Sequence, residues 1–171
     1  MKFYNLLRPR NNGESTGRKP GPYKWFEIQD NVAYYNDFEK PKIAWGNLAL
    51  KGQFALVEPG FYINAPSAFI ATDYSYLAGI LNSKLADFYI KQLGVTRNGG
   101  YFEYKPMFVE KLPIPVVPQA IQAKLMLLIE FLIENYELDD DVNKLKEATL
   151  NDIIFELYGL DNDERKTILE S

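Results

Sequence analysis

Two residue types with frequent chemical roles are absent from this sequence of 171 residues, which contains no cysteine and no histidine. Without cysteine there are no disulfide bonds, thiol nucleophiles or cysteine-bound metal sites, which fits a reducing compartment. Without histidine there is no Ser-His-Asp triad, histidine general base or histidine-bound metal. Any catalysis would therefore depend on carboxylates, lysine, tyrosine or the backbone.

Long apolar runs are absent as well, because no segment approaches the roughly 18 uninterrupted apolar residues of a membrane span. The first ten residues do not form an export signal either, since Arg8 and Arg10 follow only a short apolar stretch. We therefore predict a cytoplasmic protein with no membrane partner. The composition, with 47% hydrophobic and 25% charged residues, predicts a folded chain of one compact domain with an appendage.

Charge is unevenly distributed along the chain. Residues 1–118 carry 14 basic and 10 acidic side chains, whereas residues 119–171 carry 5 basic and 13 acidic ones. The basic part is compatible with a polyanion, and the acidic part is expected to pack on protein. Charge alone does not separate this interpretation from chance variation of the surface.

The first 24 residues are predicted to form a flexible basic leader. Asn, Gly, Ser and Pro are frequent between Arg8 and Tyr23, and Arg18 and Lys19 lie among them. Such a loop suits contact with a phosphate backbone, but a solvated leader without a partner gives the same pattern.

Residues 25–118 are predicted to form a small, mainly antiparallel twisted sheet with one packed helix, an α+β fold. Short runs rich in β-branched and aromatic residues alternate with Pro and Gly. A helix follows, with Thr72 or Asp73 as its N-cap and Gly94 as its end. A glycine loop at 95–101 and the extended segment Leu112–Pro115 come next. The predicted strands are Val32–Tyr35, Lys42–Trp45, Gln53–Val57, Phe61–Asn64, Ala68–Ala71 and Tyr101–Lys105.

Residues 119–171 are predicted to form a C-terminal helical arm used for docking. Pro118 suits the start of a helix that reaches about Glu137. A second helix is expected after Asp139–Asp141, which cap it, and Gly159 ends it. Asp161 and Glu164 predict a capping box for a last short helix. The expected buried face of the second helix consists of Val142, Leu145, Ile153 and Leu157.

Motifs of catalysis are incomplete or absent in the sequence. The segment Asn64–Ser67 lacks the second proline and the aromatic residue of amino-methylating enzymes, and no nucleotide fingerprint or P-loop is present. We therefore predict no cofactor for this chain. Asp37 and Glu39, followed by Lys40 and Lys42, are similar to a nuclease cluster, but their position before Pro41 favours an exposed turn.

A series of short motifs between Trp25 and Pro115 resembles the TaqI-like C-terminal specificity domain. That family supplies the target recognition domain of type IIG restriction–modification enzymes and of related adenine-specific DNA methyltransferases, and it is similar to the recognition domains of type I specificity subunits. Leu150–Leu160 also resembles a common methyltransferase ending. The motifs are Pro41-Lys42-Ile43-Ala44-Trp45, Phe54-Ala55, Tyr62-Ile63-Asn64, Leu81-Asn82-Ser83-Lys84-Leu85, Phe88-Tyr89, Gly99-Gly100-Tyr101 and Leu112-Pro113-Ile114-Pro115.

The resemblance implies a module that inserts loops into a DNA groove and docks on methyltransferase and nuclease parts. This chain lacks both catalytic parts, so no activity of its own is expected. S-adenosylmethionine and magnesium would belong to those missing parts, which could lie in the same longer chain or in a partner. The helical tail could alternatively pair with a second copy.

Candidate DNA-binding residues follow from side-chain chemistry. Arg97 and Asn98 are of the types that read guanine and adenine edges, and Gly99 and Gly100 beside them permit close approach. Other residues are predicted to contact phosphates, sugars or bases; these are Lys42, Lys105, Arg18, Lys19, Trp25 and Tyr101. Asn82 lies in the predicted helix, so a structural hydrogen bond is expected for it instead.

We therefore predict a DNA-specificity module of a restriction–modification or phage-defence adenine methyltransferase system. The alternative is a non-catalytic protein-interaction or scaffold domain that uses its apolar helical tail.

Overall fold

The chain contains two structural units, residues 1–37 and residues 38–171. The structure is a computed structural model, and it describes residues 3–29, 33–135, 137 and 141–171. The first unit begins with α1 (Tyr4–Leu7). The loop after α1 is closed by a backbone pairing of Pro9 with Arg18 and by an ion pair of 2.8 Å between Arg8 and Glu14. Local contacts of this kind give the basic segment a defined path.

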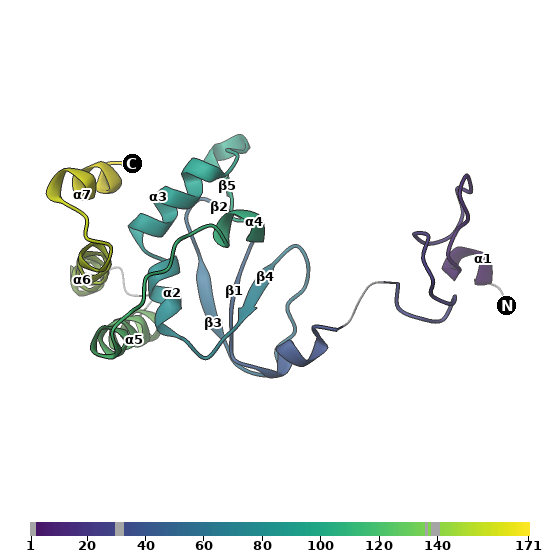
Figure 1. The fold of residues 1–171 in the computed structure, drawn as a ribbon, viewed down its shortest axis with the longest axis horizontal. Coiled ribbons are helices and arrows are strands. Elements are labelled where there is room, and N and C mark those ends of the chain that lie inside the picture. The colour runs from purple at the N-terminus through teal and green to yellow at the C-terminus, as the bar shows by residue number, and fades with distance from the viewer. Residues whose placement is uncertain (1–2, 30–32, 136, 138–140) are drawn as a thin grey trace. The chain divides into compact units, whose positions relative to one another are not determined.

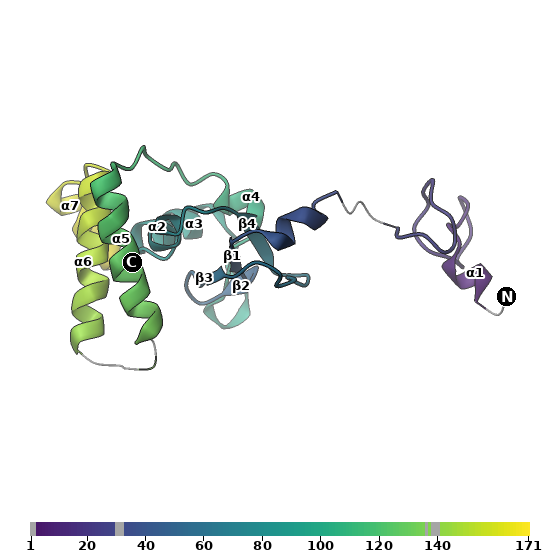
Figure 2. The ribbon, with the colours of Figure 1, turned by 90° about the horizontal axis from the view of Figure 1, so that it is seen from below.

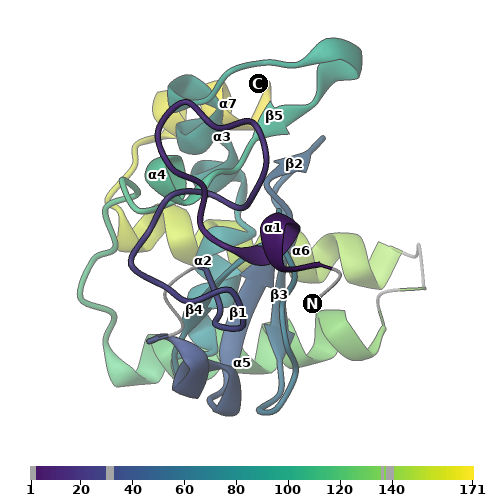
Figure 3. The same cartoon turned by 90° about the vertical axis from the view of Figure 1, so that its right-hand side faces the viewer.

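A three-stranded antiparallel sheet forms the centre of the second unit. After the 3-10 helix η1 (Tyr35–Glu39), the chain enters β1 (Lys42–Trp45), which lies between β3 (Phe54–Val57) and β4 (Ala68–Ala71) (Figure 3). Both neighbours run antiparallel to β1. The antiparallel sheet and the mixed α+β class confirm the sequence prediction.

The central strand is buried on both of its faces. Ile43 and Trp45 point to one face, where they join the main hydrophobic core, and Lys42 and Ala44 point to the other. On the core face, the Trp45 ring packs against the Phe54 ring with their centroids 5.3 Å apart. Burial on both faces explains why every residue of this strand after Lys42 is apolar.

Residues 76–93 form two helices, α2 (Tyr76–Leu81) and α3 (Lys84–Leu93), where the sequence predicted one (Figure 1). Ser83 is extended at the break, and its Oγ accepts a hydrogen bond from the Ala86 amide at 3.1 Å, which makes it the N-cap of α3. The Asn82 side-chain amide accepts a hydrogen bond from the Phe54 N–H at 2.9 Å and donates one to the Phe54 carbonyl at 2.7 Å. The backbone of a neighbouring strand would make the same pair of bonds. The structural role expected for Asn82 is confirmed.

The start of this helical region also differs from the prediction. Ser75 is the N-cap of α2, and its side chain makes no capping hydrogen bond. The Thr72 hydroxyl instead accepts a hydrogen bond from the Tyr74 amide at 3.1 Å and so forms a turn before the helix. The predicted end at Gly94 is confirmed, since α3 stops at Leu93.

A two-stranded ladder lies beyond the main sheet. It pairs β2 (Leu48–Ala49) with β5 (Phe102–Glu103), and the 3-10 helix η2 (Asn98–Gly100) lies in the loop before β5. The strand predicted at 101–105 is shorter because Lys105 caps α4 (Pro106–Val109), whose first residue is proline.

The C-terminal helices form a third layer. Figure 2 shows α5 (Gln119–Glu134) and α6 (Asp141–Leu157) side by side, and α2 packs against α5. Gly79 permits the close approach, because a Cβ there would lie 2.8 Å from Ile129 Cδ1. The last helix, α7 (Asn162–Leu169), begins with the predicted capping box of Asp161 and Glu164.

Three sequence predictions for these regions need correction. Residues 61–64 form no strand, and residues 33–34 form a turn that leads into η1, which Tyr35 begins. Val142 and Leu145 of α6 are exposed, and its buried residues are Leu150, Ile154 and Phe155. Val32, Asp139 and Asp140 lie outside the described residues, so the predicted start of that strand and the predicted cap before α6 stay predictions.

A polar network joins α3 to the connection between β2 and β3 and to the residue that follows β5. Asp87 accepts hydrogen bonds from the Gly52 amide at 2.9 Å and from the Tyr104 hydroxyl, and it pairs with Lys91 at 2.6 Å. Burial opposes ionisation of Asp87, but the bonds from Lys91, Tyr104 and Gly52 prevail and lower its pKa. Burial and the Asp87 charge raise the pKa of Tyr104 well above its usual range.

We predict that Asp87→Asn destabilises the fold by about 1–3 kcal/mol at neutral pH. The lowered pKa means that Asp87 stabilises the folded state above the unfolded pKa of about 4, and that this stabilisation is lost as the pH falls further. The difference in unfolding free energy between wild type and variant should therefore shrink below about pH 4, as measured by urea denaturation. Asp152→Asn on the exposed side of α6 is the control. A pH-independent difference would contradict this account.

Candidate nucleic-acid interface

Residues from four segments of the second unit surround a polar pocket of about 650 Å³. The segments are the turn between β1 and β2, the connection between β3 and β4, the loop after α3, and the region of β5. Carboxylate, guanidinium, ammonium and amide groups all line this space. The residues of the polar pocket are Asn47, Leu48, Pro66, Thr96, Arg97, Asn98, Glu103 and Lys105.

The loop after α3 is a tight turn closed by glycines. Its ends are joined by a pairing of Thr96 with Phe102 and by a hydrogen bond of 2.7 Å from the Arg97 amide to the Tyr101 carbonyl. Gly99 and Gly100 have φ values of 80° and 79°, in the left-handed region that glycine adopts most readily. Figure 3 shows this segment, in teal before β5, extending past the β2–β5 ladder. The predicted glycine loop is thus an ordered turn.

A carboxylate lies between two cations in the polar pocket. Glu103 Oε1 accepts hydrogen bonds from Arg97 Nε at 2.7 Å and from Arg97 Nη2, and Glu103 Oε2 pairs with Lys105 Nζ at 2.9 Å. The hydrogen bonds from Lys105 and Arg97 lower the pKa of Glu103. Glu103 is 6% exposed, whereas the Arg97 side chain is 54% exposed. The two cations therefore keep surface available to a ligand while the carboxylate is held beneath them.

Several residues predicted from the sequence come together here. Arg97, Asn98 and Lys105 line the polar pocket, Gly99 and Gly100 form the turn beside it, and Tyr101 is exposed where the turn ends. This grouping places a planar guanidinium, an amide and an ammonium group around one space.

Lys42 is a correction, because the structure does not allow the phosphate contact predicted for it. The residue is 1% exposed, and its ammonium donates to the carbonyls of Phe38 at 2.9 Å and Glu58 at 3.0 Å. A lysine buried in this way joins the segment before β1 to the segment that follows β3. The same geometry removes Lys42 from the similarity to a nuclease cluster.

Three predicted residues belong to the first unit. Arg18 donates to the carbonyls of Leu7, Lys24 and Trp25, and its guanidinium lies 4.7 Å from the centroid of the Tyr23 ring. Trp25 is half-buried and makes edge contacts with the rings of Tyr4 and Phe26. Lys19 is exposed. Arg18 and Trp25 thus have structural contacts, and of the two cations predicted in this unit Lys19 is the more exposed one.

Sequence reasoning missed five residues of the polar pocket: Asn47, Leu48, Pro66, Thr96 and Glu103. Glu103 had a usable signal. The paired glycines between Thr96 and Phe102 indicate a hairpin-like turn, and such turns bring charges from the two arms together. Thr96 lies next to Arg97 in the same loop, whereas Asn47, Leu48 and Pro66 depend on how separate segments of the chain meet, which no local pattern encodes.

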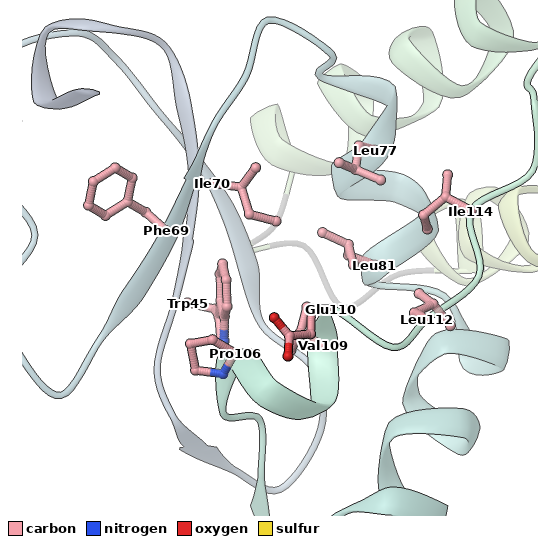
Figure 4. A pocket seen from close by; sticks show the side chains of 10 residues that line it. All are labelled: Trp45, Phe69, Ile70, Leu77, Leu81, Pro106, Val109, Glu110, Leu112 and Ile114. Carbon is pink, nitrogen blue, oxygen red and sulfur yellow. The ribbon is translucent and has the colours of Figure 1, made fainter. Parts of the chain in front are cut away.

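A second cavity, of about 300 Å³, lies between β4, α2, α4 and the segment after α4. Figure 4 shows Ile70, Leu77, Leu81 and Ile114 around it, whereas the Phe69 ring points away. Glu110 supplies its one charged side chain among the described residues. This apolar lining does not suit contact with nucleic acid.

The acidic clusters and helices show no further site within the described residues. No group of three or more Asp and Glu side chains there is placed to bind a metal ion. The Glu39 carboxylate accepts a hydrogen bond of 3.2 Å from the Tyr62 hydroxyl. No helix in the described part of the chain is long and apolar enough to cross a membrane.

The chain belongs to the TaqI-like C-terminal specificity domain family, which it matches over residues 3–114. The match covers more than half of the 171 residues and confirms the resemblance. It begins well before Trp25, where the motifs of the resemblance begin, and includes most of the first unit. A comparison with curated proteins gives no match. Membership in this family indicates DNA-sequence recognition in restriction–modification enzymes.

Proposed function

We propose that this chain selects the DNA site on which a separate catalytic part acts. That part would be an adenine methyltransferase, with or without a nuclease, of a type IIG, type I-like or phage-defence system in the cytoplasm. S-adenosylmethionine and magnesium would be bound there and not by this chain. The observation that carries the proposal is the polar pocket, where Arg97 is both exposed and held in place.

The chemistry of the polar pocket suits the edge of a base pair. An arginine side chain donates two parallel hydrogen bonds to guanine O6 and N7, and an asparagine amide pairs in the same way with adenine. Lys105 adds a positive charge for a nearby phosphate, which fixes position without reading sequence. Asn98 and Arg97 lie next to each other on one turn, so both reach the same stretch of groove.

The helical arm supports a protein partner. Leu127 of α5 and Leu145 of α6 are 68% and 66% exposed, in a part of the chain that carries 13 acidic and 5 basic residues. The partner in this proposal is the catalytic part of the system, and a second copy of the chain is the other candidate. The same exposure favours the alternative function, a scaffold domain without DNA binding.

Selection from a random-sequence duplex pool tests the proposal. The whole chain is incubated with the pool at low and at physiological salt, and retained duplexes are sequenced. We expect enrichment of a short motif. If duplexes are retained in a salt-sensitive way but no motif is enriched, the chain does not recognise a DNA sequence by itself. No retention at low salt would favour the scaffold function.

Variants of two cations separate base reading from phosphate contact. Arg97→Ala should lower discrimination between the enriched duplex and unrelated duplexes by about 10–100-fold, because a bidentate base contact is worth about 1–3 kcal/mol. Lys19→Ala should weaken all duplexes alike and reduce the salt dependence of affinity by about one log unit per log of salt. Fluorescence titration measures both effects. If Arg97→Ala changed only the unfolding temperature, the polar pocket would not be the reading site.

A further inference from the structure

We propose that Glu103 is a positioning residue that aims Arg97 at a guanine in the recognised site. This inference rests on the proposed function and deepens it, because it names one base of the site and the group that sets its readout. Glu103 touches no base itself; it acts through Arg97.

The geometry leaves one edge of the guanidinium available. Arginine has five N–H donors in a rigid plane. Glu103 Oε1 accepts from Nε and from Nη2, so the carboxylate occupies the side edge of the guanidinium. Glu103 does not use the end edge, formed by Nη1 and the outer hydrogen of Nη2, and the Arg97 side chain as a whole is 54% exposed. Two parallel donors on that edge match guanine O6 and N7.

Glu103 lies in β5 of the β2–β5 ladder, whereas Arg97 lies in the glycine turn before η2. Leu48 faces Glu103 in the β2–β5 ladder, and the next amide, of Tyr104, donates to the Asn47 carbonyl at 2.9 Å. Tyr104 is itself 1% exposed. The Glu103 carboxylate, held by the ladder, therefore fixes the orientation of the Arg97 side chain, whose own backbone lies in a loop. Supporting residues of binding sites act in this way.

The same carboxylate moderates the charge of the polar pocket. Arg97, Lys105 and Glu103 together carry a net charge of +1, and the lowered pKa keeps Glu103 ionised at neutral pH. Replacing the carboxylate with an amide would leave two cations facing DNA. Attraction to any phosphate backbone would then rise while the aim of Arg97 is lost. Affinity for unrelated DNA should therefore rise, while the preference for guanine should fall.

Glu103→Gln in the full chain tests this expectation, with Glu58→Gln as the matched control. Glu58 is an exposed glutamate that directly follows Val57, the residue paired with Lys42 at the end of the sheet remote from Trp45 and Asn47. Affinity is measured over a salt series for the enriched duplex and for the same duplex with its guanine replaced. Glu103→Gln should bind unrelated duplexes more tightly and lower the preference for guanine about tenfold or more. Its salt slope should steepen by up to about 1. Glu58→Gln should leave the preference unchanged.

Glu103→Asp separates the effect of geometry from the effect of charge. It is also the replacement test if Glu103→Gln does not fold. It keeps the negative charge but withdraws the acceptor by one methylene, so the guanine preference should fall while the salt slope stays that of wild type. An unchanged preference in a folded Glu103 variant would overturn this inference and leave the proposed function standing. A Glu103 variant that loses affinity for all duplexes equally would also overturn this inference without affecting the proposed function. Failure of the wild-type chain to enrich any motif would overturn both.

Discussion

Tyr104, whose side chain is buried, connects the parts of the second unit through three hydrogen bonds. Its hydroxyl donates to Asp87 of α3, its amide donates to the turn at Asn47, and its carbonyl accepts from Trp45 Nε1 at 2.6 Å. The three bonds link the helix layer, the β2–β5 ladder and the central strand. Because successive side chains of an extended chain point to opposite faces, burying Tyr104 turns its neighbours Glu103 and Lys105 outward into the polar pocket. The core and the candidate DNA-binding site are therefore two sides of the same short segment.

Cations in this chain divide into structural and available ones according to the groups that they bond. Lys42 and Arg18 both donate hydrogen bonds to backbone carbonyls. For the buried Lys42, these bonds compensate for the loss of water around its ammonium group. Arg97 and Lys105 instead share one carboxylate and keep their outer surfaces exposed. A basic residue in the sequence is thus weak evidence for DNA binding until its partners are known.

Local patterns predicted the parts of the fold that local forces determine. The strands at 42–45 and 68–71 follow from short runs of strand-favouring residues bounded by Pro and Gly. The helix after Pro118, the end at Gly94 and the capping box at Asp161 follow from proline, glycine and capping chemistry. The break between α2 and α3 combines the N-cap of Ser83 with hydrogen bonds between Asn82 and Phe54, and this second contact cannot be predicted from a local pattern because Phe54 is distant in sequence. The burial of Lys42 likewise depends on carbonyls from two separate turns.

The candidate site was predictable to a similar degree. Arg97, Asn98, the paired glycines and Lys105 stand out by residue type, and the structure brings them to one pocket. The role inferred for Glu103 depends on its contacts with both cations, which sequence spacing alone does not establish. Asn47 and Pro66 enter the pocket through the meeting of separate connections.

Amide hydrogen exchange on the full chain, with and without bound duplex, tests most directly whether the polar pocket is the DNA-facing surface. We expect bound duplex to slow exchange at 97–105, at Leu48 and in the turn at Asn47. Slowing confined to α5 and α6, with the turn at 97–101 unchanged, would contradict it.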